Sequence, residues 1–297
     1  MAIIKTSNLT KKFGELVAVD RLNLEIASGE CFGLLGPNGA GKTSLIRMIT
    51  AVSPPTEGDI WVNSQHLARF PRQVKAILGV VPQVNNLDDD LNVLQNLTTF
   101  ARYFSIPRHE AYRRSLEVLE LFQLEDRQKS RIKELSGGMK RRLLIARSLL
   151  NHPRIMILDE PSIGLDPQAK HLVWQKLKEL KSQGVTQLLC TQNMEEAALL
   201  CDRVAIMHLG KVLALNTPQE LISRYVGSTV WEIELTPEGR DEIVRQLNSR
   251  QLEFEEMGNT IQVFHAGDDL AGMFRARPRS ATLEDVFFRL TGRVLVE

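Results

Sequence analysis

The sequence of 297 residues predicts an α/β fold in which helices cover a parallel sheet. Short apolar runs alternate with longer stretches of helical periodicity, as in successive βαβ units. The runs are ECFGLLG, RIMILDE, TQLLCT and RVAIMHLG, which begin at Glu30, Arg154, Thr186 and Arg203. Runs of this length that are apolar throughout suit strands buried on both faces. The chain is long enough for a large domain and a small one, since domains rarely grow beyond ~250 to 300 residues.

The first domain is expected to span residues 1–226 and to contain an insertion. From about residue 84 to 150 the alternation stops, and apolar residues such as Leu94, Leu97 and Ala101 recur at helical spacing. No buried strand is indicated within this stretch. We therefore expect an inserted α-helical subdomain.

Residues 227–297 are expected to form a small α+β domain. WEIEL, LEFEEM and TIQVFH alternate apolar and polar residues with period two, and Gly258-Asn259 suits a hairpin turn between the last two. Thr282 and Asp285 have capping-box spacing ahead of a short amphipathic helix. The basic stretch at residues 275–279 either binds an anion or forms a solvated loop.

Composition limits the possible partners. Lysine and arginine total 37 against 36 acidic residues, a net charge of +1, so no nucleic acid is expected as a partner. No leader segment and no apolar run of the ~20 residues needed to cross a bilayer is visible, so we expect a soluble cytoplasmic chain that can still dock on a membrane protein. Cys31, Cys190 and Cys201 lack metal-ligand spacing and are expected to be reduced core residues.

The stretch GPNGAGKTS, between an apolar strand and a predicted helix, matches a phosphate-binding loop. Its residues are Gly36, Pro37, Asn38, Gly39, Ala40, Gly41, Lys42, Thr43 and Ser44. Glycines allow the backbone amides to approach phosphate oxygens, and the helix N-terminus adds a positive dipole end. Lys42 is expected to reach the β- and γ-phosphates of ATP, and Thr43 to hold Mg²⁺. The alternative is a glycine-rich turn that binds nothing.

Two adjacent carboxylates end the apolar run RIMILDE. At the carboxyl edge of a parallel sheet, Asp159 is placed to hold the Mg²⁺ shell and Glu160 to polarise an attacking water. A solvated strand end ahead of Pro161 would explain either acid alone.

A serine and two glycines open the stretch LSGGMKRRLLIARSLL. Ser136 is a good helix cap, and the exposed amides after it favour a second anion site at a helix N-terminus. A plain N-capped amphipathic helix fits the same residues.

The ordered set GPNGAGKT, VPQ, LSGGM, ILDEP and GLD resembles the nucleotide-binding subunits of ABC transporters, over about residues 3 to 225. The resemblance implies a P-loop NTPase core with an inserted α-helical subdomain and a small C-terminal α+β appendage. It also implies two ATP molecules held head to tail between two such chains.

The resemblance assigns roles to further residues. Ser136, Gly137 and Gly138 would contact the γ-phosphate in the partner's site, and Asp166 would lie at the interface. Gln83 of VPQ would contact Mg²⁺ and the attacking water, and would report occupancy of the site to the helical subdomain.

Three positions vary within the family pattern. Phe13 aligns with the aromatic residue, commonly tyrosine, that stacks on adenine, although core packing would also explain it. Met139 replaces the usual glutamine. Gln192 in TQNMEEA replaces a histidine that normally contacts the γ-phosphate; its amide donates a hydrogen bond but carries no proton in catalysis. Asn193 and Glu196 have the spacing of a helix cap and its reciprocal carboxyl.

SGGMKRRL, DEPSIGLDP and ATLEDVFFRLTGR resemble, more narrowly, the ATPases of drug-resistance and lipo-oligosaccharide (nodulation-factor) exporters. This branch implies an ATP-hydrolysing subunit, usually a homodimer, that sits peripherally at the cytoplasmic face of the membrane on a separate integral permease. The alternative is a soluble ABC ATPase that acts on ribosomes or DNA, or a subunit that senses ATP with little turnover.

Overall fold

The computed structural model describes residues 1–235, 239–267, 269–274 and 276–292. They form two compact units, Met1–Ala214 and Leu215–Glu297. The boundary falls inside strand β10 (Lys211–Asn216), earlier than the boundary after residue 226 expected from sequence. The reason is that helix α8 (Pro218–Tyr225) packs on α11 (Leu283–Thr291) within the second unit.

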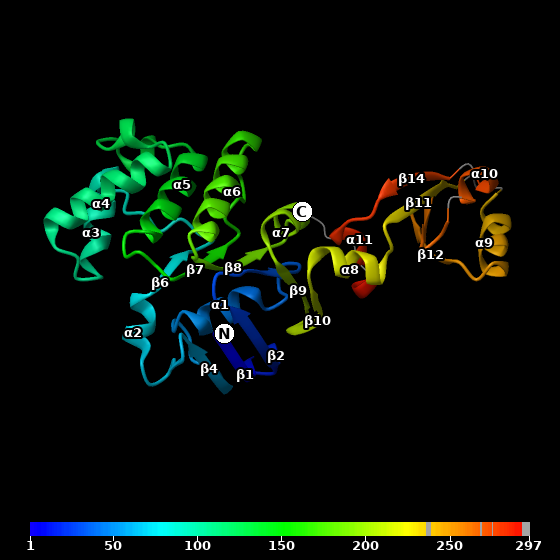
Figure 1. The fold of residues 1–297 in the computed structure, drawn as a ribbon, viewed down its shortest axis with the longest axis horizontal. Helices are drawn as coiled ribbons and strands as arrows, with labels where there is room; N and C mark the ends of the chain where they lie inside the picture. The colour runs from blue at the N-terminus through cyan, green and yellow to red at the C-terminus, as the bar shows by residue number, and fades with distance from the viewer. Residues whose placement is uncertain (236–238, 268, 275, 293–297) are drawn as a thin grey trace. The chain divides into compact units, whose positions relative to one another are not determined.

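The first unit contains the expected α/β core (Figure 1). Its strands are β1 (Ala2–Phe13), β2 (Leu16–Ala27), β3 (Cys31–Leu35), β4 (Glu57–Val62), β5 (Gln65–His66), β6 (Leu78–Val81), β7 (Ile155–Asp159), β8 (Thr186–Thr191), β9 (Arg203–His208) and the start of β10. Its α-helices are α1 (Lys42–Ile49), α2 (Pro71–Ala76), α3 (Val93–Arg102), α4 (Arg108–Leu121), α5 (Gly137–Ser148), α6 (Pro167–Ser182) and α7 (Met194–Leu200).

Six strands form one sheet in the order β10-β9-β3-β8-β7-β6. The pairs β3–β8, β3–β9, β6–β7 and β7–β8 are parallel, and β3, β7 and β8 are buried along their whole length. The apolar runs therefore form the doubly covered sheet that the sequence predicts. Parallel strands also bring their carboxyl ends to one edge, where the loop after β3 and the acids after β7 meet.

A second, antiparallel sheet has the order β2-β1-β4-β5. Helix α1 contacts β2 of this sheet and β7 of the parallel sheet, so it lies between the two layers. One apolar core joins all three, with members such as Ile4 and Leu24 from the antiparallel sheet, Leu45 and Met48 from α1, and Ile157 from β7. The helix that begins at the phosphate-loop motif is thus fixed from both sides.

Helices α3, α4 and α5 occupy the stretch between β6 and β7 and pack on one another (Figure 1). Two short 3₁₀ turns, Glu125–Arg127 and Ile132–Glu134, lead from α4 to α5. Asn92 and Gln95 form a capping box at the start of α3. The helical periodicity from Leu94 onward correctly predicts this segment.

Side-chain caps fix three helix starts close to the motifs. Ser136 accepts a hydrogen bond from the backbone N–H of Met139, Asp166 from that of Ala169 at 2.9 Å, and Asn193 from that of Glu196 at 2.8 Å. The cap expected at Asn193 is confirmed. The reciprocal carboxyl bond is not formed, because the buried Glu196 carboxylate accepts from the indole N–H of Trp174 at 2.8 Å instead.

The second unit is an α+β domain. Its four strands and two of its helices follow one another in the order βαββαβ. It contains β11 (Thr229–Glu234), α9 (Arg240–Ser249), β12 (Glu253–Met257), β13 (Thr260–Phe264), α10 (Leu270–Phe274) and β14 (Arg277–Ser280), besides α8 and α11. The sheet is antiparallel with order β12-β13-β11-β14, the ferredoxin-like arrangement. The hairpin at Gly258-Asn259 and the capping box of Thr282 and Asp285 are confirmed.

The basic stretch at 275–279 lies partly outside the described residues, since Arg275 is not among them. A solvated loop is wrong for the rest, because Arg277–Ser280 pairs with β11 as strand β14. The guanidinium of Arg279 forms ion pairs with Glu232 at 2.7 Å and Asp285 at 2.6 Å. Its charge is thus matched by acids of the same unit.

The structure also bears on two expectations from the sequence, the absence of a membrane-spanning segment and the burial of the three cysteines. No helix among the described residues is long and apolar enough to cross a membrane. Cys31, Cys190 and Cys201 are free thiols and all are buried, as the sequence predicts.

Candidate functional site

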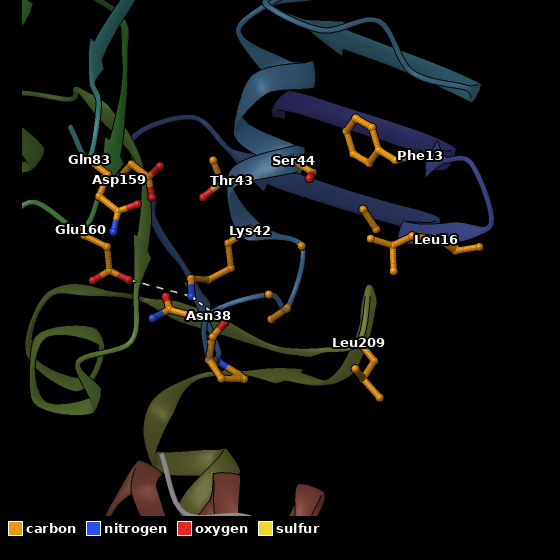
Figure 2. A pocket seen from close by; sticks show the side chains of 16 residues that line it. Phe13, Leu16, Asn38, Lys42, Thr43, Ser44, Gln83, Asp159, Glu160 and Leu209 are labelled. Atoms are coloured by element: carbon orange, nitrogen blue, oxygen red, sulfur yellow. Dashed lines mark hydrogen bonds and ion pairs between the residues drawn. The ribbon is translucent and has the colours of Figure 1, made fainter. Parts of the chain in front are cut away.

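A cavity of about 350 Å³ opens at the carboxyl edge of the parallel sheet (Figure 2). It gathers most of the residues singled out from the sequence. The lining residues are Phe13, Leu16, Val17, Ala18, Pro37, Asn38, Gly39, Ala40, Gly41, Lys42, Thr43, Ser44, Gln83, Asp159, Glu160 and Leu209. Polar groups lie at one end and apolar side chains at the other, which suits a ligand with a charged tail and a flat apolar head.

The loop between β3 and α1 depends on glycine. Gly41 has φ +105°, and a Cβ there would lie 2.2 Å from the carbonyl oxygen of Ala18. Gly39 has φ +82°. Because side chains are excluded by conformation at both positions and by contact at the first, the loop exposes backbone at the cavity wall. A glycine-rich turn with an unrelated purpose would not need a cavity beside it.

Lys42 begins α1 and its side chain is buried at the floor of the cavity. Its ammonium donates to the carbonyl oxygens of Gly36 and of Pro37, the latter at 3.2 Å, and lies 3.9 Å from a carboxylate oxygen of Glu160. Burial lowers the pKa of Lys42, and the Glu160 carboxylate opposes the shift. This ammonium has no close carboxylate partner of its own and is a strong donor for an incoming phosphate.

Asp159 is the last residue of β7 and faces Thr43 at the start of α1 (Figure 2). Burial raises the pKa of Asp159, while Lys42 and a hydrogen bond from the Thr43 hydroxyl act in the opposite direction. The side chain of Gln83 points into the same end of the cavity. A carboxylate, a hydroxyl and an amide together supply the oxygen ligands that Mg²⁺ prefers.

Glu160 follows β7 in a left-handed backbone conformation with φ +50°. A non-glycine residue in this region carries strain of order ~1 to 3 kcal/mol, which the surrounding contacts must offset. Burial raises the pKa of the carboxyl, opposed by Lys42 and by the backbone N–H of Gln192. The hydroxyl of Thr191 also donates to Glu160, at 3.4 Å. A carboxyl with a raised pKa in a polar cavity is suited to accept a proton from water.

Phe13 lies at the other end of the cavity, beside Leu16 and across from Glu160 (Figure 2). Its ring is 53% exposed, so core packing does not explain it. The ammonium of Lys11 lies 5.1 Å from the ring centre. An exposed ring at a cavity mouth is available to stack on a flat aromatic group.

Five sequence-predicted residues are not in this cavity: Ser136, Gly137, Gly138, Asp166 and Gln192. The first four lie together elsewhere, since a Cβ at Gly138 would come within 4.0 Å of the Asp166 carboxylate. Gln192 follows β8 and reaches Glu160 only through its backbone N–H. The amides after Ser136 therefore do not line the cavity of their own chain.

Sequence reasoning missed part of the apolar end and one hydroxyl. Leu16, Val17, Ala18 and Leu209 line the cavity because β2 and the turn after β9 fold beside the phosphate loop. Thr191 donates to Glu160. For Thr191 a signal existed, since it ends a buried strand next to β7; the apolar residues gave none, because contacts between distant segments leave no local pattern.

Comparison with known proteins identifies the family. A family model described as ABC transporter matches residues 19–163. Over 303 residues, 98% of both chains, the sequence is 41% identical to the Nod factor export ATP-binding protein I of Cupriavidus metallidurans. The chain belongs to the ATP-binding subunits of ABC transporters. The Paraburkholderia xenovorans protein of the same name is 42% identical over 298 residues, which cover 98% of each chain.

The structure leads to the same family. A dimeric ATP-binding cassette, solved in a post-hydrolysis state with ADP and Pi, superposes with a TM-score of 0.67 at 29% identity. The match covers 72% of this chain and 98% of the cassette. The fold class expected from sequence, an ABC ATPase core, is thereby confirmed.

The activity follows from the family. This ABC subunit binds ATP and is an ATPase of the export branch, which couples hydrolysis to transport. The full-length relatives do not favour an ATPase acting on ribosomes or DNA.

Proposed function

We propose that two copies of this subunit close head to tail on two ATP molecules, with Mg²⁺, and that each closure drives a separate membrane permease. The observation that carries the proposal is the division of the predicted site. The cavity holds Lys42, Asp159 and Glu160, whereas Ser136 and its glycines lie outside it. A second copy could supply those amides to the open side of the cavity.

The oxygen-bearing residues at the polar end fit Mg²⁺. Thr43, Gln83 and Asp159 offer a hydroxyl, an amide and one carboxylate. Magnesium is usually held by one or two carboxylates together with the phosphates of its substrate, so a cluster of acids is not required. When bound there, Mg²⁺ would neutralise charge on the β- and γ-phosphates.

Each remaining residue has a chemical task in hydrolysis. Lys42 would give up its bonds to loop carbonyls and donate to the phosphates. Glu160, with its raised pKa, would accept a proton from the attacking water and Gln83 would orient that water. Phe13 would hold the adenine ring at the apolar end. Phosphoryl transfer needs positioning and charge neutralisation rather than a covalent intermediate, and this arrangement supplies both.

The dimer would be powered by ATP itself. An anion between the phosphate loop of one copy and the helix start at Ser136 of the other contacts two positive dipole ends at once. Asp166, next to Gly138, would lie at the same interface. Since ATP then binds the closed dimer better than the open one, its binding shifts the population toward closure and its hydrolysis reverses the shift.

The permease would meet the helical subdomain formed by α3, α4 and α5. Beside it, Tyr103 is 82% exposed and lines a groove with Phe104 and Ile106, while Val84, just after Gln83, is 74% exposed. Exposed apolar side chains of this kind favour a protein contact. The subunit would then work peripherally at the cytoplasmic face of the membrane.

The names of the relatives support a cargo class. They are named for the export of Nod factors, so we propose outward transport of a lipo-oligosaccharide or a similar amphiphile. In this scheme the cargo is bound by the permease.

The dimer is tested with Glu160→Gln, which keeps the shape of the side chain and removes its basicity. With ATP and Mg²⁺, this variant should elute as a dimer in size-exclusion chromatography and should hydrolyse ATP at least ~100-fold more slowly. Glu195→Gln, an exposed acid paired with Lys170, is the matched control and should behave as the unchanged protein. A Glu160→Gln variant that stays monomeric with ATP and turns it over normally would overturn the proposal.

The permease is tested by purifying the tagged subunit from detergent-solubilised membranes. A polytopic membrane protein should co-purify, and Tyr103→Glu should release it without changing ATP binding. Recovery of ribosomes or DNA in its place would contradict the transport role.

A further inference from the structure

Arg141, one turn into α5, is bound to the protein entirely through backbone carbonyls. Its side chain is only 5% exposed. Nε donates to the carbonyl oxygen of Pro161 at 2.9 Å. Nη2 donates to the carbonyl oxygens of Asp159 and Glu160, the latter at 2.7 Å. Nη1 donates to those of Pro82 and Gln83, the latter at 3.4 Å.

These carbonyls belong to two segments that both reach the nucleotide cavity. Pro82 and Gln83 follow β6, Asp159 ends β7, and Glu160 and Pro161 follow it. The arginine itself belongs to the helix that begins after Ser136. One guanidinium therefore joins the proposed partner-facing helix, the segment of Gln83 and the segment of Glu160.

Within the described residues, the hydrogen bonds of the Arg141 guanidinium all go to carbonyls and none to a carboxylate, although carboxylates are near. Burial lowers the pKa of Arg141, and the charges of Asp159, Glu196 and Glu160 oppose that shift. An arginine keeps its proton in proteins and offers five donors in a planar fork. All five N–H donors are needed to bind five carbonyls that belong to two segments, whereas a lysine has three donors on a single nitrogen.

The carbonyls of residues 159–161, at the end of β7 and just after it, are consecutive in the chain, and all of them accept from the Arg141 guanidinium. A regular strand would turn successive carbonyls to opposite sides, so the chain must curl here. The curl is made by Glu160, the residue with φ +50°. Bonds to the carbonyls of Asp159, Glu160 and Pro161 oppose relaxation of this conformation, which aims the Glu160 carboxylate toward Lys42.

We propose that Arg141 is a positioning residue for hydrolysis: it holds Glu160 in its strained conformation and couples Gln83 and the Ser136 helix to it. The inference rests on the proposed role of Glu160 as the base. A shift of α5, such as closure on a second copy would impose, is then passed to both catalytic segments through one side chain. Arg141 does not line the cavity.

Arg147 supplies a matched control on the same helix. It is similarly buried, 7% exposed, and burial lowers its pKa to about 10. It binds the carbonyl and side-chain oxygens of Asn86 and lies over the Phe100 ring, with the guanidinium 4.6 Å from the ring centre. Its guanidinium bonds to Asn86 and not to residues 159–161, so its removal costs packing and a buried charge without freeing Glu160.

The test compares Arg141→Ala with Arg147→Ala in the full chain, by kcat, by ATP affinity without turnover and by melting temperature. Arg141→Ala should lower kcat roughly 100-fold, because a small displacement of a catalytic group has that cost, with ATP affinity nearly unchanged. Arg147→Ala should lower the melting temperature to a similar degree and change kcat far less. An equal loss of kcat in the two variants would overturn the proposal.

Two further measurements cover the case in which Arg141→Ala does not fold. Arg141→Lys keeps the charge but cannot reach both segments, so it should fold and still lose kcat; full activity would contradict the inference. Where Arg141→Ala folds, millimolar guanidinium should restore kcat to it and not to Arg147→Ala. If guanidinium fails to restore kcat and Glu160→Gln is inactive, only the role of Arg141 is contradicted. If Glu160→Gln is active, the proposed mechanism itself is contradicted.

Discussion

Two ion pairs, one in each unit, use similar side chains in opposite ways. In the first unit, Lys42 and Glu160 are both buried, yet their charged atoms are 3.9 Å apart and their pKa values are moved against the charged forms by burial. In the second, Arg279 and Asp285 lie 2.6 Å apart with two bonds between them. There, burial alone would raise the pKa of Asp285, but Arg279 and the cap at Thr282 outweigh it and lower the pKa.

The difference distinguishes an ion pair in a ligand cavity, Lys42 with Glu160, from one that stabilises the fold, Arg279 with Asp285. The Arg279 pair has matched geometry and additional bonds, the condition under which a partly buried pair does not destabilise a fold. The Lys42 pair leaves donor capacity unused, so an incoming phosphate gains more from it. Burial disfavours the charged forms of Lys42 and Glu160, and the same two charges face the cavity.

The largest expected effect is on catalysis, from Lys42→Ala. Loss of one preorganised donor should lower ATP hydrolysis by about 10²- to 10³-fold. The folded state should lose little, because the removed charge is buried at a cost. Steady-state ATPase assays and thermal melts measure the two effects. A large drop in melting temperature with modest loss of rate would mean that Lys42 acts as Arg279 does.

Arg279→Met should give the converse result. It leaves the buried Asp285 carboxylate without its partner, which should destabilise the second unit by about 2 kcal/mol. Hydrogen exchange should become faster in β11 and α11 and stay unchanged in α1, with ATP hydrolysis by the isolated subunit close to normal. Lys211→Met, at an exposed ion pair with Asp20, is the control and should change neither. Unchanged protection in β11 would show that the Arg279–Asp285 ion pair does not stabilise the second unit.

Gln192→His should have a smaller effect, on rate and on its pH dependence. A histidine can carry a proton or a positive charge near Glu160, which a glutamine cannot. Hydrolysis should rise roughly tenfold and acquire a stronger pH dependence between ~6 and 8, with ATP affinity unchanged. If both rate and pH profile are the same, Gln192 is a bystander.

Acidification should change the stability of the two pairs least, and in opposite directions. The folded pKa of Asp285 is below 3.8, so its stabilisation is complete above that pH and is lost as pH falls through the folded value. The folded pKa of Glu160 is above 4.5, so its buried charge is unfavourable above the folded value and is relieved as pH falls, while activity is lost. Hydrogen exchange and ATPase rates from neutral pH downward should show activity failing before β11 loses protection.

The sequence predicts local features of this molecule well and long-range contacts poorly. Buried strands and capped helices carry periodic or adjacent signals, which is why β7, the cap at Asn193 and the box at Thr282 were expected. The phosphate loop was found because its glycines and lysine are contiguous. Arg141 and the Glu196–Trp174 bond were not found, because each depends on segments brought together only by the sheet order. The boundary between the two units also depends on a long-range contact, since α8 packs on α11 near the end of the chain.

The position of Ser136 outside its own cavity has a genetic consequence under the composite-site proposal. A chain defective at both Lys42 and Ser136, paired with an intact chain, would spoil both sites of the dimer, one through each defect. The same two defects carried on different chains would fall together on one site and leave the other whole. An allele defective only at Lys42 and one defective only at Ser136 would therefore complement each other. An allele that carries both defects would instead inactivate the dimers that it forms with the intact chain.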